Sequence, residues 1–183
     1  MTKEGCPEEW RPRQCRHCQA QGRFHRHGFY TRKLYTLFEA LDLVIFRFKC
    51  TTCERTFGLF PPFLLPYRGA ALEVQEEVIR LVDQGRPLET ITERLTSATE
   101  PYSAKTLWRW KKEWNNTREL LEPSFWVQVF TRFPHIRSPE GVTKTAWGRI
   151  FAVWQETKDE LAAEGACCLQ WLKYLARAPA VAV

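Results

Sequence analysis

Two pairs of cysteines, each with two residues between its members, constrain the fold of this chain more than any other feature. The first pair is Cys15 and Cys18, and the second is Cys50 and Cys53. A Cys-x-x-Cys turn places both thiolates on one side of a tight loop, and two such turns brought together form a tetrahedral cage. Structural Zn²⁺ prefers this set of ligands, so the sequence predicts a zinc site. Iron is an alternative metal, because tetrahedral sulfur geometry suits both.

Other chemistry fits these cysteines less well. Disulfide bonds are typical of secreted chains, and nothing in the sequence marks this chain as secreted. A thioredoxin-type motif is a single Cys-x-x-Cys that opens a helix, whereas the segment between these pairs has a strand-like sequence. His17 lies inside the first turn, where four thiolates already complete the ligand set. Cys6 has no such partner and is expected as a free thiol in a loose N-terminal tail, residues 1–14.

The segment between the pairs is predicted to form antiparallel strands of a small zinc ribbon, residues 15–57. Residues 22–30 alternate polar and aromatic side chains around Gly28, which indicates a strand or a bulged hairpin. Residues 43–49 form the clearest strand. One face would carry Val44, Phe46 and Phe48, and the other Ile45, Arg47 and Lys49. So small a sheet has little core of its own, so the metal is expected to stabilise it.

A proline-rich connector and two helices are predicted next. Residues 58–70 are apolar and contain several prolines, which favours a packed connector over a helix, a central strand or a flexible linker. Residues 71–83 have a helical apolar stripe and an acidic outer face, and Gly85 is a good terminator. Pro87 suits the first turn of a second helix.

A third helix is predicted from Ala104 to about Asn115, with Ser103 as its N-cap. Its inner face would consist of Leu107, Trp110 and Trp114. Its outer face would consist of Lys105, Arg109 and Lys112, with Thr106 and Trp108 at the sides. The charge changes sharply at this point: residues 71–102 contain 3 Lys/Arg and 7 Asp/Glu, whereas residues 103–118 contain 5 and 1.

An acidic helix, a mixed helix and a capped basic helix form the layout of a helix-turn-helix unit, residues 71–116. The last helix of such a unit enters the major groove of double-stranded DNA. A solvated basic face without a nucleic-acid partner is the alternative interpretation. The predicted DNA-binding residues are Ser103, Lys105, Thr106, Trp108, Arg109, Lys111 and Lys112. His25 and His27 are expected to face solvent, with phosphate contact as an alternative.

Residues 117–183 are predicted to form a helical C-terminal region for oligomerisation or partner binding. An aromatic cluster is expected around a short helix near Phe125, followed by a helix over residues 143–164 and a final helix that includes Cys168. The tryptophans of this region would form core or a dimer interface. Cys167 and Cys168 are expected as buried thiols rather than metal ligands.

Several of these motifs together resemble a known group of proteins. They are Cys15-x-x-Cys18, Cys50-Thr-Thr-Cys-Glu-Arg-Thr-Phe57, Leu64-Leu-Pro-Tyr-Arg68 and Ser103-Ala-Lys-Thr-Leu-Trp-Arg-Trp110. Residues 15–115 resemble the zinc-ribbon and helix-turn-helix front end of bacterial insertion-sequence transposases, and related stand-alone transposase-like proteins. The resemblance implies zinc on the four cysteines and DNA contact by residues 103–112. Two departures are a longer loop before the third helix and the absence of a catalytic domain.

The sequence therefore predicts an α+β, cytoplasmic, DNA-binding protein of a bacterial mobile element that is not an enzyme. Two-metal DNA cleavage requires three carboxylates on a large mixed scaffold, and the only aspartates are Asp42, Asp83 and Asp159. Double-stranded DNA is the expected partner, and a transposase or recombinase and a second copy of the chain are further candidates. No membrane association is expected, because no apolar run approaches the length of a membrane span. The rival interpretation is an adaptor whose ribbon and aromatic C-terminal helices bind another protein.

Overall fold

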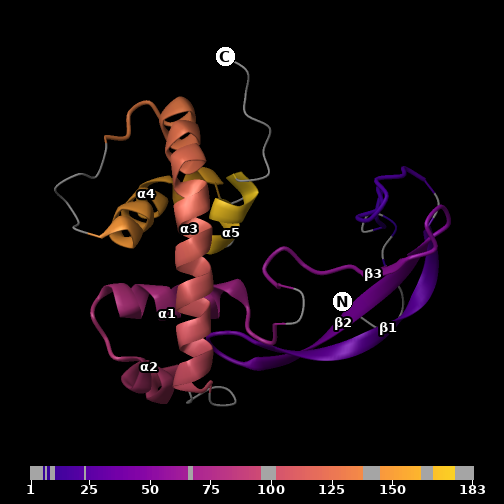
Figure 1. Ribbon diagram of the computed structural model, residues 1–183, viewed down its shortest axis with the longest axis horizontal. Helices are drawn as coiled ribbons and strands as arrows, with labels where there is room; N and C mark the ends of the chain where they lie inside the picture. Colours follow the sequence, from indigo (N-terminus) through magenta and orange to yellow (C-terminus); the bar gives the residue numbers. More distant parts are fainter. Residues whose placement is uncertain are drawn as a thin grey trace.

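The computed structural model describes residues 6, 8, 11–22, 24–65, 68–95, 102–137, 145–161 and 167–175 of the 183-residue chain. These residues form a three-stranded antiparallel sheet followed by helices (Figure 1). The strands are β1 (Phe24–Tyr35), β2 (Ala40–Cys50) and β3 (Thr56–Gly58), and the helices are α1 (Leu72–Asp83), α2 (Leu88–Leu95), α3 (Ala104–Arg132), α4 (Ala146–Leu161) and α5 (Cys168–Leu175). The predicted α+β class is confirmed.

β1 and β2 form a long hairpin, and β3 pairs with the other edge of β2. The register shifts by one residue between Arg26 and Phe29, and Gly28 at the shift has a φ of +99°. A residue with a side chain adopts this backbone conformation at a cost, whereas glycine adopts it readily. The predicted bulged hairpin is therefore confirmed, and Gly28 is the residue that permits the bulge.

The two faces of β2 enter two separate apolar clusters, as the alternation predicts. Val44, Phe46 and Phe48 lie in a small cluster with Cys15 and Cys50. On the opposite face, Ile45 is fully buried in the main core, together with Leu34 of β1. The hairpin is thus stabilised at one end by the cysteine turns and at the other by the helices.

The turn of the hairpin is anchored to α1. Thr36 Oγ1 accepts hydrogen bonds from the backbone N–H groups of Phe38 and Glu39, which closes the turn. The backbone N–H of Leu37 donates to Glu73 of α1 over 3.2 Å. The opposite end of the hairpin, which carries the cysteines, points away from the helices (Figure 1). The hairpin therefore extends from the helical part of the molecule as an arm.

The helices share one core, and α3 runs through its middle (Figure 1). Trp114 of α3 and Trp171 of α5 are among the largest fully buried side chains. The indole N–H of Trp114 donates to Gln75 of α1 over 2.9 Å, which satisfies two polar groups inside the core. As predicted, Gly85 terminates α1 with a φ of +81°.

The predicted end of the third helix near Asn115 is wrong, because α3 continues to Arg132. The division at residues 116/117 therefore falls inside one continuous helix. Two charged residues occupy inward positions and obscure the apolar stripe: Arg118 forms an ion pair with Glu122 one turn later. Pro123 lies inside the helix at an exposed position, where water can satisfy the carbonyl that its missing N–H leaves open.

The C-terminal helices agree in outline with the prediction. α4 covers Ala146–Leu161 of the predicted 143–164, and the remaining residues of that range, apart from Thr145, lie outside the described part of the chain. Thr145 accepts a hydrogen bond from the N–H of Gly148 and thereby caps α4. Cys167 and Cys168 are buried free thiols, as expected. Among the described helices, none combines the length and hydropathy that a membrane span requires.

Candidate metal centre and nucleic-acid interface

The four cysteines of the two Cys-x-x-Cys turns converge on one point. The sulfur atoms of Cys15 and Cys53 are 3.7 Å apart, those of Cys18 and Cys50 are 3.8 Å apart, and all four lie within 4.8 Å of one another. A tetrahedral site with metal–sulfur bonds of about 2.3 Å has sulfur–sulfur edges of about 3.8 Å. The cluster therefore has the size and the ligands of a metal site.

The two turns have the same backbone conformation. Gln19 and Glu54, which directly follow the second cysteine of each pair, have φ values of +58° and +56°. The backbone N–H of Cys15 donates to the carbonyl of Ala20 over 2.9 Å, and that of Cys50 donates to the carbonyl of Arg55 over 3.0 Å. A left-handed residue without glycine costs about 1 kcal/mol or more, so its occurrence in both turns indicates that this conformation serves the site.

Backbone N–H groups favour the thiolate form at the first cysteine of each turn. A hydrogen bond from the backbone N–H of Cys53 lowers the pKa of Cys50 to about 6, against the opposing effect of burial. The backbone N–H of Cys18 likewise lowers the pKa of Cys15. A deprotonated thiol is the form that binds a metal, so the turns prepare two ligands for it.

Two neighbouring residues lie near the metal site but outside the ligand set. Among the described residues, the cluster of possible metal ligands consists of the four cysteines. The ring of His17 lies outside this cluster and packs edge-on against Phe57. Cys6 is a free thiol, as expected, but it is half-buried against the small cluster rather than in a loose tail. Apart from Cys6, Glu8 and residues 11–14, the predicted tail lies outside the described residues.

The predicted DNA-binding residues lie on the first turns of α3. The Ser103 side chain accepts a hydrogen bond from the N–H of Thr106 over 3.3 Å, so the predicted N-cap is confirmed. Leu107, Trp110 and Trp114 are buried, as predicted for the inner face. Ser103, Lys105, Trp108, Arg109 and Lys112 are exposed, and Thr106 and Lys111 are half-buried.

The exposed face of α3 presents cations beside an aromatic ring. Trp108 is 51% exposed, and Lys112 lies over its ring at 5.4 Å from the centroid. Within the described part of the chain, Lys105, Arg109 and Lys111 form no ion pair with a carboxylate. Positive charge on this face is therefore available to an anionic partner.

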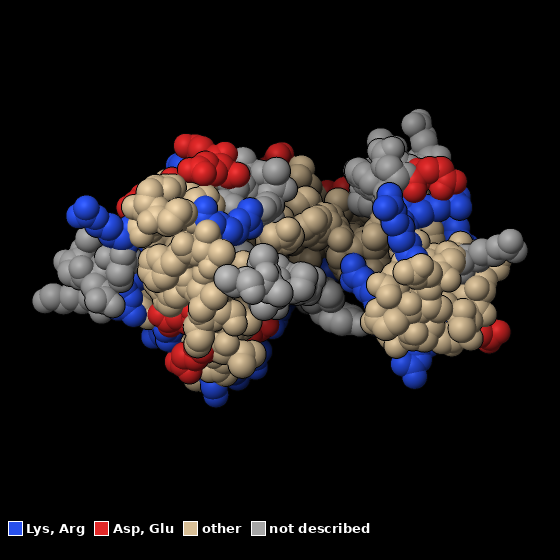
Figure 2. Space-filling model, turned by 90° about the horizontal axis from the view of Figure 1, so that it is seen from above, with Lys and Arg blue, Asp and Glu red and all other residues tan. Residues whose placement is uncertain are grey.

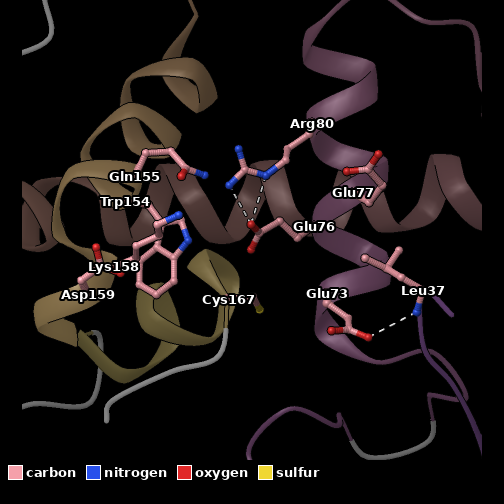
Figure 3. Close-up of a pocket in the computed structure, with 10 residues that line it drawn as sticks. All are labelled: Leu37, Glu73, Glu76, Glu77, Arg80, Trp154, Gln155, Lys158, Asp159 and Cys167. Atoms are coloured by element: carbon pink, nitrogen blue, oxygen red, sulfur yellow. Dashed lines mark hydrogen bonds and ion pairs between the residues drawn. The ribbon is translucent and has the colours of Figure 1, made fainter. Parts of the chain in front are cut away.

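A pocket of about 570 Å³ lies between α1 and α4, and it is lined in part by glutamates of the predicted acidic outer face of residues 71–83 (Figure 3). One of these glutamates does not face solvent as predicted. Glu76 is buried, and its carboxylate accepts hydrogen bonds from Arg80 and from the backbone N–H of Leu169 at the start of α5. Burial, and then the charge of Glu76, raises the pKa of Cys167 to about 12. These contacts join α1 to α5, which no short sequence pattern reveals.

The part of the chain that carries the cysteine cluster and the start of α3 also defines its family. Residues 15–110 match the model of a domain of unknown function, DUF6431. The chain belongs to this family. The DUF6431 match begins at the first metal-site cysteine and ends at Trp110 on α3, so it includes both cysteine turns. Neither a curated protein nor a solved structure matches the chain.

Proposed function

We propose that this chain is a zinc-containing DNA-binding protein of the cytoplasm that acts without a catalytic centre of its own. The observation that carries the proposal is the start of α3, a capped helix whose exposed cations have no ion-pair partner among the described residues. The N-terminus of a capped helix adds its partial positive charge to these side chains. A phosphate backbone complements this surface.

The cysteine cluster supports zinc as its metal. Four thiolates in a closed tetrahedral set leave no open position for substrate, which is the pattern of structural rather than catalytic zinc. Cys15, Cys18, Cys50 and Cys53 would hold the ion, and the ion would stabilise the end of the hairpin.

The arrangement of α1, α2 and α3 supports a helix-turn-helix role, with α3 as the helix that enters the major groove. The three helices contact one another, and α3 presents its N-terminal half to solvent. Together with the sequence resemblance stated above, this favours an accessory factor or regulator of a bacterial mobile element. A transposase or recombinase is the proposed protein partner.

Binding of zinc-loaded protein to duplex DNA at several salt concentrations tests this function. We expect Lys112→Ala to weaken binding to all duplexes alike and to reduce the slope of log affinity against log salt by about 0.9. Arg109→Ala should cost about 1–3 kcal/mol at one base position if it reads guanine. The control is Lys158→Ala, which removes an exposed charge from α4. Equal binding by all three variants and the wild type would contradict a role of α3.

A second candidate function is that of an adaptor that binds another protein, and one observation favours it. After Glu113, an exposed apolar stripe follows the cations on α3, beside the exposed Glu119. Leu120 is 78% exposed and Val127 is 65% exposed, and Phe130 lies one turn later on the same side. An exposed apolar stripe of this kind indicates contact with another protein chain. Protein capture without duplex binding would favour the adaptor over the DNA-binding role.

A further inference from the structure

Positive charge is concentrated at the end of the hairpin that carries the cysteines. We define this cysteine end as residues 11–22 and 47–56, which contain six Lys/Arg and one Asp/Glu. Residues 31–43, around the turn at the opposite end, contain two of each. Lys and Arg side chains stand around the hairpin part of the molecule in Figure 2, at the right of the view. The net charge of −2 on a Zn²⁺ ion with four thiolates leaves the cysteine end positive.

Four arginines of the cysteine end lack an ionic partner among the described residues. They are exposed, and they are Arg13, Arg16, Arg47 and Arg55. The other two cations of this end lie near carboxylates: Arg11 pairs with Glu8 at 2.7 Å, and Lys49 lies 3.8 Å from Glu54.

In the helical part of the molecule, several arginines have a carboxylate partner. Arg80 of α1, Arg94 of α2 and Arg149 of α4 each have a carboxylate within 4.0 Å. Arg118 in the second half of α3 also has one. Arg86 and Arg137 also lack a carboxylate partner among the described residues, but they are isolated, whereas four such arginines lie together at the cysteine end. Guanidinium groups bind phosphate through paired, directional hydrogen bonds, so an unneutralised cluster of them fits a phosphate-bearing partner.

The length of the arm indicates how the cysteine end and the start of α3 relate. β1 has 12 residues and spans about 36 Å at 3.3 Å per residue. One turn of B-DNA is about 34–36 Å long. The hairpin turn is fixed to α1, so the arm holds the cysteine end at about this distance from the turn.

We infer that the cysteine end is a second DNA-binding surface, which contacts the phosphate backbone beyond the site of α3. This inference rests on the proposed function and adds a separate contact to it. The metal positions the arginines, because Arg16 lies within the first cysteine turn and Arg55 follows the second. Recognition here is of phosphate geometry and charge, so the contact is independent of base sequence.

The experiment compares two variants of equal charge on zinc-loaded, full-length protein. The test variant is Arg16→Ala/Arg55→Ala, and the control is Lys33→Ala/Lys158→Ala, which removes two exposed cations elsewhere. Binding is measured on duplexes of about 10 and about 30 base pairs at several salt concentrations. On the long duplex, we expect the test variant to reduce the salt slope by about 1.8, with no change for the control. On the short duplex, the test variant should resemble the wild type.

The zinc content of each variant is measured alongside, because loss of metal would disturb the whole cysteine end. If Arg16→Ala/Arg55→Ala loses zinc, Arg13→Ala/Arg47→Ala replaces it, since these residues lie outside the cysteine turns. Equal slopes for the test and control variants, with normal wild-type binding, would overturn the second surface and leave α3 as the DNA site. Absence of wild-type binding at about 50 mM salt would instead overturn the proposed function and this inference together.

Discussion

The position of the Cys53 sulfur depends on a tight turn directly after β2. β2 ends at Cys50, and the chain must turn back within three residues to bring the Cys53 sulfur to 3.7 Å from that of Cys15. Glu54 accepts a left-handed backbone conformation directly afterwards. The position of this one sulfur atom therefore depends on a strained turn, and a bound metal would compensate the strain.

We predict that Cys53→Ser loses the metal and unfolds the cysteine end. A serine hydroxyl is a weak ligand for zinc compared with a thiolate, so the tetrahedral set is broken. Elemental analysis should fall from one zinc per chain to near zero, and amide hydrogen exchange should increase over residues 15–57. Cys6→Ala is the matched control, and it should retain the metal. Full zinc content in Cys53→Ser would show that the cluster is not the binding site.

At the scale of elements, α3 shows what sequence pattern can and cannot predict. Its start was predicted because the signals are local: Ser103 caps, and Leu107, Trp110 and Trp114 recur at helical spacing. Its second half was missed because Arg118 and Glu122 occupy inward positions, where they form an ion pair and Glu122 also contacts Arg149 of α4. A pattern of apolar residues cannot indicate a polar pair that becomes compatible with the core only after folding.

The candidate sites also include one that the sequence pattern predicts and one that it does not. The convergence of the four cysteines was predicted, because each Cys-x-x-Cys turn determines its own geometry and strands join the two turns. The cysteine-end arginines were not predicted as a group. Whether an arginine such as Arg47 or Arg149 has a carboxylate from another element nearby depends on which elements pack together, as for Arg149 of α4 and Glu122 of α3.

The exposed apolar stripe on the second half of α3 leads to a prediction about self-association. In an antiparallel pair of α3 helices centred on Pro123 and Ser124, Leu120 of one copy would face Val127 of the other, and the polar Asn116 would face Thr131. We predict that the wild type forms dimers and that Leu120→Glu is monomeric, because each of the two copies would place a carboxylate against an apolar residue of its partner. Analytical ultracentrifugation measures this.

Phe38→Glu is the control for this experiment, since Phe38 is 83% exposed at the hairpin turn and is not part of the stripe on α3. It should leave the dimer intact. A wild-type chain that sediments as a monomer at all concentrations would exclude the antiparallel pair and leave the stripe to a different protein.

At the scale of the whole molecule, the buried residues fall into two clusters of unequal size. The large one joins the hairpin turn, the connector and all five described helices, and the small one lies at the cysteine end. The sequence suggested a boundary at residue 116, but Trp114 packs in the same cluster as Trp171 and Leu169. The family match ends within α3, yet this match describes related sequence and not a separate core.

We therefore predict that a chain ending at Asn116 loses its fixed helical core and keeps its metal. The truncation uncovers the inner faces of α1 and α3 and leaves Glu76 without the N–H of Leu169, whereas all residues of the small cluster remain. Near-UV circular dichroism should lose its tryptophan signal while elemental analysis still finds zinc. A chain ending at Leu175, which retains every described residue, is the control. A native-like spectrum for the shorter chain would show that the first three helices fold alone.

The hydrogen bond from Leu169 to Glu76 also has a consequence for synthesis of the protein, because its two residues are 93 positions apart. At typical translation rates, about 5–20 s separate the appearance of Glu76 from that of Leu169. During this time the cysteine turns are already complete outside the ribosome, while the inner side of α1 still lacks α4 and α5. The arm can therefore form first, and the apolar inner faces of α1 and α3 stay uncovered until translation is nearly finished.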